Sequence, residues 1–374
     1  MDQASRKADD LGPAKIIEVR NPALGLDAVL VVDNVAAGPA IGGLRMAADV
    51  SVDECARLAR AMTLKNAAAG LPHGGGKSVL SGDPRMLPER KEQLIRAFAH
   101  ALRNERDYIF GPDMGTNEAC MAWVKDELKD HGERVAGLPR EIGGIPLDEV
   151  GATGWGLAHA ADIAVTHAGF ALKGARVVVQ GFGAVGYHAA RFLAQQGAVL
   201  VGAADSAGAL HDPAGIDLTR LRQLKEAGKT VLDYPGGRKL ARDDVIGIEC
   251  DIWIPAARPD VINESNVDRL KTRLVIQGAN IPCTRAAEEI MHRRGILNVP
   301  DFIANAGGVI CAAMEYRGAS QTAAFDTIAE KLRRNTSEVL SCVSQGGVLP
   351  RDAALDLAAT RVRKAMSMRR WGIY

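Results

Sequence analysis

The pattern of hydrophobic and polar residues near the start of the chain predicts a hairpin followed by a helix. Residues 16–35 contain two β-rich runs separated by a turn at 21–25. Ser51 and Glu54 then have the spacing of a capping box, and apolar residues follow at helical period. We therefore expect a helix from about residue 52 to the high sixties.

The next segments predict a loop, a second helix and a short strand. Residues 70–78 are rich in glycine, and we expect them to form a loop whose backbone can approach a ligand closely. Residues 88–103 have the period of an amphipathic helix, and residues 108–110 resemble a short buried strand. This strand leads into Asp113, and an acid at the end of a strand is a common location for chemistry.

The pattern changes near residue 150. Residues 137–156 are rich in glycine and proline without a clear period, which indicates a domain boundary. Beyond it, helical and β-rich runs alternate, as a doubly wound parallel sheet requires, at 155–168 (helix), 176–179 (strand), 187–195 (helix), 199–204 (strand), 251–255 (strand) and 274–278 (strand). After residue 308 the pattern is helical to the end.

A glycine-rich sequence after the first of these strands predicts a dinucleotide site. It has the form G-x-G-x-x-G, opens a helix, and consists of Gly181, Phe182, Gly183, Ala184, Val185 and Gly186. Asp205 ends the next strand, where an acid can accept hydrogen bonds from both ribose hydroxyls and repel a 2′-phosphate. This favours NAD over NADP, although Ser206 could still bind a 2′-phosphate, so use of both cofactors stays open.

We therefore expect an α/β fold with two domains around a cleft, the second a Rossmann-like doubly wound nucleotide-binding domain. The expected divisions are a first domain at 1–148, the nucleotide-binding domain at 149–305, and C-terminal helices at 306–374 that pack back on the first domain.

Composition narrows the possible partners. The 374 residues are 47% hydrophobic and 24% charged, which is typical of a globular chain. The 46 basic and 45 acidic residues leave a formal charge of +1, so no overall field favours nucleic acid or an anionic membrane, and a small-molecule partner is expected. The first residues have no apolar core for a signal peptide and no segment is long enough for a membrane span, so we expect a cytoplasmic location.

The six cysteines give no C-x-x-C pair, which argues against a disulfide framework and a thiolate zinc site. A separate set of residues suggests chemistry. Lys65 falls on the apolar side of its predicted helix, where a lysine needs an anionic partner or must reach solvent. Lys77 ends the glycine-rich segment, and Asp113 follows the predicted strand.

These residues lie within motifs that resemble the glutamate/leucine/phenylalanine/valine dehydrogenase family. The motifs are GGLRM (42–46), LKNAAAGLPHGGGK (64–77), GPDMGT (111–116), ATG (152–154), GFGAVG (181–186), QGAN (277–280) and PDFIANAGGV (300–309). The resemblance implies an NAD(P)-dependent amino-acid dehydrogenase, needing no metal, that forms a homo-oligomer through its first, catalytic domain.

The resemblance also implies roles for single residues. Lys65 would hold the substrate α-carboxylate, Lys77 would be a catalytic lysine, and Asp113 would be the general acid/base. Thr153 would lie near the nicotinamide carboxamide, Asn280 near the nicotinamide ribose, and Asn305 near the cofactor or substrate.

The substrate side chain is expected to meet an apolar pocket. Glutamate-using members carry a lysine directly before the pair Gly42 and Gly43, where this chain has Ile41, and a serine at the position that matches Ala312. With Val309, these residues suit leucine, valine, isoleucine, methionine or phenylalanine. Residues 140–160 nevertheless resemble glutamate-using members, so a glutamate dehydrogenase that binds the distal carboxylate through another residue, such as Arg45, remains an alternative. A non-catalytic NAD-binding regulator is a further alternative.

Overall fold

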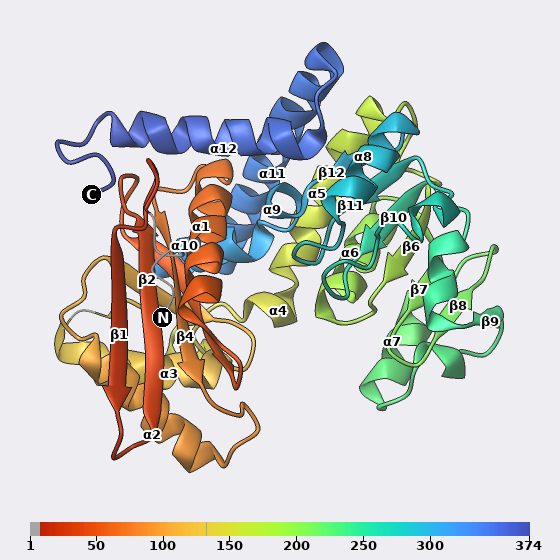
Figure 1. Cartoon of the computed structure of the whole chain (residues 1–374). Coiled ribbons are helices and arrows are strands. Elements are labelled where there is room, and N and C mark those ends of the chain that lie inside the picture. The colour runs from red at the N-terminus through yellow and green to blue at the C-terminus, as the bar shows by residue number, and fades with distance from the viewer. Residues whose placement is uncertain (1–7, 132) are drawn as a thin grey trace. The chain divides into compact units, whose positions relative to one another are not determined.

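The computed structural model describes residues 8–131 and 133–374, which fall into two compact units. Unit 1 comprises 1–147, 309–324 and 355–374, and unit 2 comprises 148–308 and 325–354. Each unit contains its own β-sheet (Figure 1). Within the described ranges, no helix is both long and apolar enough to cross a membrane.

Unit 1 is built on a five-stranded sheet of order β1-β2-β4-β3-β5. The strands are β1 (Lys15–Asn21), β2 (Leu26–Asn34), β3 (Ala40–Ala47), β4 (Gly74–Ser81) and β5 (Tyr108–Pro112). β2 is antiparallel to β1 and β4, whereas β3 is parallel to β4 and β5. The predicted hairpin at 16–35 is confirmed as β1 and β2.

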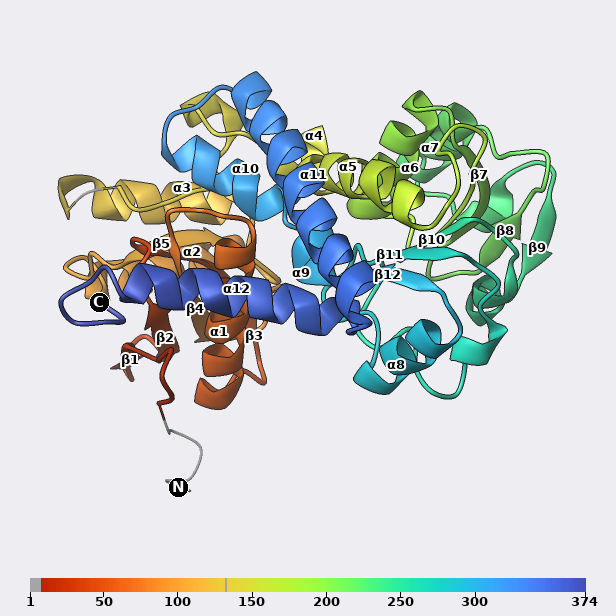
Figure 2. The same cartoon turned by 90° about the horizontal axis from the view of Figure 1, so that it is seen from above.

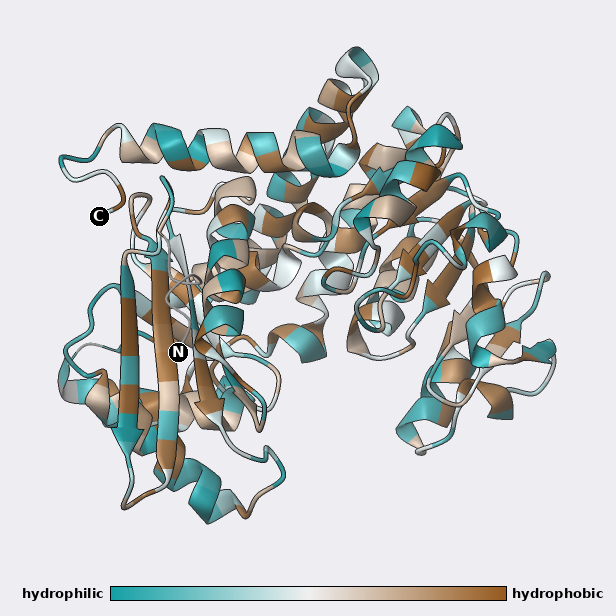
Figure 3. Cartoon of the chain, in the orientation of Figure 1, coloured by the Kyte–Doolittle hydropathy of each residue, from teal (hydrophilic) through white to brown (hydrophobic). Residues whose placement is uncertain are grey.

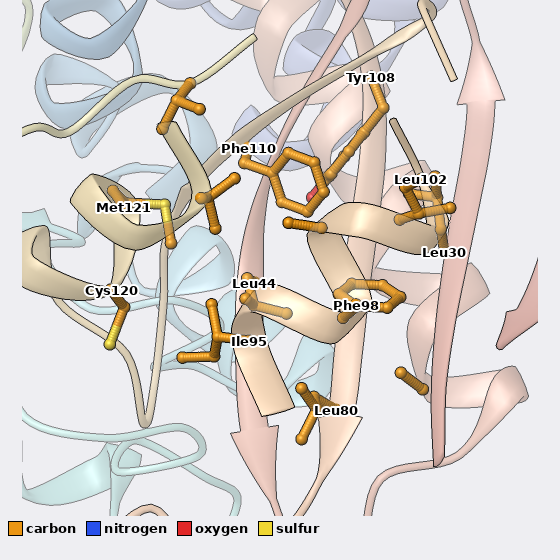
Figure 4. Packing of buried hydrophobic residues seen from close by; sticks show 14 of the residues in the cluster. Leu30, Leu44, Leu80, Ile95, Phe98, Leu102, Tyr108, Phe110, Cys120 and Met121 are labelled. Atoms are coloured by element: carbon orange, nitrogen blue, oxygen red, sulfur yellow. The ribbon is translucent and has the colours of Figure 1, made fainter. Parts of the chain in front are cut away.

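Helices cover both faces of this sheet, as Figure 2 shows. The helices of unit 1 between β3 and residue 150 are α1 (Val52–Ala68), α2 (Pro88–Ala101), α3 (Glu118–Leu128) and α4 (Leu147–Val150), the last of which crosses into unit 2. On one face, Cys55 and Ala59 of α1 pack against Val31 and Val79. On the other, α2 and α3 bury Phe98 and Met121 against Leu30, Leu44, Leu80 and Phe110 (Figure 4). Ser51 caps α1 by accepting from the Glu54 amide at 3.1 Å, but the Glu54 carboxylate bonds Arg45, so only the Ser51 half of the predicted capping box forms.

The glycine-rich segment 70–78 is not the open loop that we expected. From Gly74 onward it forms β4, the central strand, buried between β2 and β3. A Cβ at Gly75 would lie 1.9 Å from the Thr63 backbone nitrogen of α1. The glycines therefore permit close approach of the neighbouring helix α1. Because glycine has no side chain, this strand shows no alternation of hydrophobic and polar residues in the sequence.

Unit 2 contains a seven-stranded sheet of order β12-β11-β10-β6-β7-β8-β9. Its strands are β6 (Arg176–Gln180), β7 (Val199–Ala204), β8 (Ala209–His211), β9 (Arg238–Leu240), β10 (Ile252–Pro255), β11 (Leu274–Ile276) and β12 (Leu297–Val299). The pairs from β12 to β7 are parallel, and β8 and β9 add an antiparallel edge. Figure 3 shows the hydrophobic colouring of the buried strands, in contrast to the mixed surfaces of the helices.

The remaining helices are α5 (Ala152–His167), α6 (Ala184–Gln195), α7 (Leu218–Glu226), α8 (Arg285–Arg293), α9 (Asp301–Ala304), α10 (Gly307–Tyr316), α11 (Gln321–Gly346) and α12 (Pro350–Met366). We expected all of 306–374 to pack on the first domain, but 325–354 belongs to unit 2. Aromatic and ionic contacts account for this difference. Phe325 stacks on Trp155 with ring centroids 5.7 Å apart, and Arg333 pairs with Asp162.

Close packing at Gly75 gives a test of the strand assignment. Gly75→Ala should lower the free energy of unfolding by about 1–3 kcal/mol, because its Cβ would overlap α1 backbone. Gly111→Ala is the matched control in β5, where a Cβ meets nothing closer than 3.7 Å, so it should be neutral or stabilise by up to about 1 kcal/mol. Chemical denaturation measures both, and equal losses would contradict this packing.

Candidate functional site

Lys77 and Asp113 form a buried ion pair in unit 1. Lys77 lies within β4 and Asp113 immediately follows β5, and the Lys77 Nζ is 2.7 Å from the Asp113 Oδ1. The Lys77 side chain is 5% exposed and that of Asp113 is 23% exposed. Lys65 lies in the last turn of α1 and is half-buried. The structure thus brings two of the three predicted polar residues into direct contact.

Arg45 is a second partner of Asp113. Its Nε lies 2.8 Å from the Asp113 Oδ2, and its Nη1 lies 2.7 Å from the Glu54 Oε1 in the first turn of α1. We considered Arg45 only as an alternative ligand for a substrate carboxylate. Its guanidinium instead bonds two carboxylates of the chain, which leaves that alternative without support from the geometry.

These contacts set the protonation of the pair. Burial lowers the pKa of the Lys77 ammonium below its usual value, although Asp113 partly offsets this effect. Burial alone would raise the pKa of Asp113, but Lys77 and Arg45 outweigh it and hold that pKa below its usual value. The carboxylate is therefore ionised at neutral pH, and the ammonium is easier to deprotonate than a solvated lysine.

The backbone at Gly42 and Gly43 is tightly fixed beside this pair. A Cβ at Gly43 would lie 2.7 Å from the Asp113 Cβ, and one at Gly42 would lie 1.9 Å from the Gly76 carbonyl oxygen. The buried Tyr108 hydroxyl donates to the Gly42 carbonyl at 2.8 Å. Only glycine fits at these two positions, so β3 packs closely against β4 and against Asp113.

The predicted pocket residues of unit 1 lie on β3 and α10. Ile41 is 3% exposed, Ala312 is 7% exposed, and Val309 is half-buried. One turn after Ala312, the Glu315 carboxylate accepts from the amides of 137, 138 and 145 at 2.8–2.9 Å. Burial raises the pKa of Glu315 despite these three donors. The carboxylate therefore anchors α10 to the segment that precedes α4.

In unit 2, the glycine-rich turn packs closely and leads into α6 without a side-chain cap. Gly181 has a φ of 97° and lies against Ala256, while a Cβ at Gly186 would be 2.0 Å from the Gly181 carbonyl oxygen. A Cβ at Gly183 would meet no described atom within 4 Å. Gly183 caps α6, no side chain fills its cap, and the first turn of α6 has no acid. The helix thus presents open N–H donors suited to a pyrophosphate.

Asp205 is in place at the end of β7, but its carboxylate is already bonded. The Lys225 Nζ lies 2.6 Å from its Oδ2, which also accepts from the Val231 amide. Burial alone would raise the pKa of Asp205, but Lys225 and backbone amides lower it. Lys225 lies on α7, next to an open cavity of about 470 Å³ lined also by Gly183, Tyr187 and Arg222. Lys225 could not be found from the sequence, because no motif links its position to that of Asp205.

The other predicted cofactor residues lie near this sheet. Thr153 is in the first turn of α5, and Ser206 is exposed in the turn after Asp205. Asn305 is buried, and its Nδ2 donates to the Oδ1 of the exposed Asn280 at 2.9 Å. Among the described residues, no group of three or more His, Cys, Asp or Glu side chains could hold a metal.

The fold and the turn define a dinucleotide-binding α/β protein with a separate lysine-aspartate site, and comparisons identify its family. Residues 143–370 match Glutamate/Leucine/Phenylalanine/Valine dehydrogenase, and residues 13–130 match the Glu/Leu/Phe/Val dehydrogenase, dimerisation domain. The chain therefore belongs to this family, as its motifs predicted, and is an NAD(P)-dependent amino-acid dehydrogenase.

Individual relatives cover most of the chain. A glutamate dehydrogenase of Aeropyrum pernix is 36% identical over 359 residues, which is 90% of this chain and 85% of that protein. An NADP-specific glutamate dehydrogenase of Saccharolobus shibatae is 37% identical over 320 residues, which is 81% of this chain and 75% of that protein. The hetero-hexameric glutamate dehydrogenase of Thermus thermophilus superposes with a TM-score of 0.84 at 29% identity, covering 97% of this chain and 91% of that one.

The Asp205–Lys225 pair predicts opposite effects of two substitutions on cofactor affinity. Asp205→Ala should weaken NADH binding by about ten-fold more than NADPH binding, because a ribose acceptor is lost and Lys225 is left to attract a 2′-phosphate. Lys225→Ala should weaken NADPH more than NADH. Fluorescence titration measures the Kd of each variant for NADH and for NADPH. If the ratio of these two Kd values stays unchanged in both variants, other residues discriminate between the cofactors.

Proposed function

We propose that the chain catalyses the reversible oxidative deamination of an apolar L-amino acid, of the leucine, valine or phenylalanine class, to a 2-oxo acid and ammonia. The observation that carries this proposal is Ile41. It is buried beside the glycine pair, at the position where we expect a lysine in glutamate-using members. Ala312 likewise stands where a serine would be expected. Burying a side-chain carboxylate without these partners would cost several kcal/mol.

Glutamate dehydrogenase is the second candidate, and the comparisons favour it. The relatives named above are glutamate dehydrogenases and match over most of the chain. The case for an apolar substrate rests on residues 41 and 312 alone. Because Arg45 is bonded to Asp113 and Glu54, a glutamate-binding site would need a cation from another position.

Lys65, Lys77 and Asp113 supply the remaining chemistry in this proposal. The chemistry that NAD(P) supplies is acceptance of hydride from the substrate Cα. Lys65 holds the substrate α-carboxylate. Asp113 takes a proton from the water that adds to the substrate imine, while Lys77 stabilises the oxygen that develops negative charge. The 2.7 Å contact between Lys77 and Asp113 allows the pair to exchange that proton.

The intact pair favours an enzyme over a regulator of the same fold. A non-catalytic NAD-binding protein would have no need for a buried lysine with a lowered pKa beside an ionised carboxylate. We also propose that the chain forms a homo-oligomer through unit 1, where residues 13–130 match a dimerisation domain. NADH formation measured over a panel of L-amino acids would separate the two substrates and the regulator.

The first catalytic test is Asp113→Asn, which keeps the side-chain shape and removes its charge. Turnover should fall by about a hundred-fold or more, the effect typical of a lost acid/base, while NADH affinity stays unchanged. Asp27→Asn serves as the control, because Asp27 is an exposed carboxylate paired with Arg20. Near-normal turnover of Asp113→Asn would remove this residue from the mechanism.

The substrate test is the double variant Ile41→Lys with Ala312→Ser. It should gain measurable activity on glutamate and lose most of its activity on leucine-like substrates, whose apolar end would meet a desolvated ammonium. The kcat/KM values of wild type, both single variants and the double variant measure this effect. We expect the two substitutions to couple rather than add.

A wild-type protein that prefers glutamate over every apolar amino acid would contradict the pocket assignment. In that case, the similarity to glutamate dehydrogenases would be the better guide to the substrate.

A further inference from the structure

Unit 2 contains a buried cluster of charged side chains between α8, α9 and α12. Glu288 of α8 and Asp301 of α9 have side chains that are 3% and 8% exposed, and both bond to Arg351 in the first turn of α12. None of these three residues belongs to the catalytic or cofactor residues predicted above. Ionised groups at this depth require full hydrogen bonding, so the contacts of each member decide what the cluster does.

Arg351 joins the two acids through separate nitrogens. Its Nε and Nη2 each lie 2.7 Å from a Glu288 carboxylate oxygen, and its Nη1 lies 3.0 Å from the Asp301 Oδ1. Its Nη2 also reaches the Gln277 side-chain oxygen at 3.1 Å. Burial alone would lower the pKa of Arg351, but Glu288 and Asp301 outweigh it and raise that pKa.

The second oxygen of Asp301 holds the loop that follows β11. The Ile281 amide donates to the Asp301 Oδ2 at 2.8 Å. Ile281 has a φ of 49°, a left-handed conformation that β-branched residues rarely adopt, and the residue is 56% exposed. Such a conformation persists only where its surroundings hold it, and here the Asp301 carboxylate supplies the bond.

Asn280, which precedes Ile281, has a second support from α9. The Asn305 amide donates to the Asp301 carbonyl at 2.7 Å, and the Asn305 Nδ2 donates to the Asn280 Oδ1 at 2.9 Å. Asn280 is therefore fixed from two sides, by the Ile281 turn and by Asn305. The first support depends on the Asp301 carboxylate, whose orientation Arg351 fixes, and the second depends on the backbone of α9.

We propose that Arg351 is a positioning residue for the nicotinamide half of the cofactor, acting through Asp301 on the loop that carries Asn280. This inference rests on the proposed function and on the expectation, from the family resemblance, that Asn280 lies near the nicotinamide ribose. The adenosine half is expected at Gly183 and Asp205, which Arg351 does not contact. Loss of Arg351 should therefore weaken ligands that contain the nicotinamide ribose and spare those that end at the diphosphate.

The test compares NADH with ADP in calorimetric titrations of the full chain carrying Arg351→Lys. Lysine keeps the positive charge, but as a compact ammonium it cannot reproduce the forked bonds to Glu288 and Asp301. We expect the Kd for NADH to rise by about ten-fold and the Kd for ADP to change by less than about two-fold. The KM for cofactor should rise in parallel, with a smaller change in kcat.

Arg285→Lys is the matched control. Arg285 also joins α8 to the first turn of α12, through the exposed Asp352 at 2.8 Å, but it does not contact Asp301. Its affinities for NADH and ADP should equal those of wild type. If Arg351→Lys fails to fold, Asp301→Asn replaces it, because it removes the acid's charge while keeping its size, and it should show the same selective loss of NADH.

The outcomes are distinguishable. Wild-type affinity for NADH in Arg351→Lys, or equal losses of NADH and ADP, would overturn the positioning role and leave the proposed function intact. A wild-type chain that binds none of NADH, NADPH and ADP would instead overturn the proposed function.

Discussion

The close approach of α1, β3 and β4 is the constraint on which the candidate catalytic site depends. Backbone atoms lie where a side chain would otherwise stand at Gly42 and Gly75. This packing makes β4 the central strand of its sheet and buries Lys77. A buried ammonium needs a counter-charge, and Asp113 provides it at the end of β5. The lowered pKa of Lys77 thus follows from its burial, which close packing at these glycines makes possible.

Most of the correct predictions of secondary structure came from patterns among residues that are close in sequence. Local periodicity and capping predicted the hairpin, α1 with its Ser51 cap, and the alternation from β6 to β7. The strand β4 could not be predicted in this way, because its glycines have no side chains and therefore show no alternation of hydrophobic and polar residues. The motifs likewise predicted the family and indicated Lys77 and Asp113 as candidate catalytic residues.

What could not be predicted were the partners of these residues. Arg45 reaches Asp113, Lys225 reaches Asp205, and Arg351 reaches Asp301, each across a long stretch of chain. Such pairings depend on which strand and helix ends meet in the folded unit, and residue type alone does not specify them. Both predicted acids, Asp113 and Asp205, therefore act within local electrostatics that the sequence motifs do not describe.

The bonds of Glu315 have a consequence for how substrate preference can diverge. Three backbone amides hold α10 by its last turn, so the helix does not depend on the identity of the residues at 309 and 312 for its placement. In the pocket that we propose for the substrate side chain, a replacement at either position would leave these three bonds intact. Under that proposal, substrate preference changes without loss of the bonds that hold α10 in place.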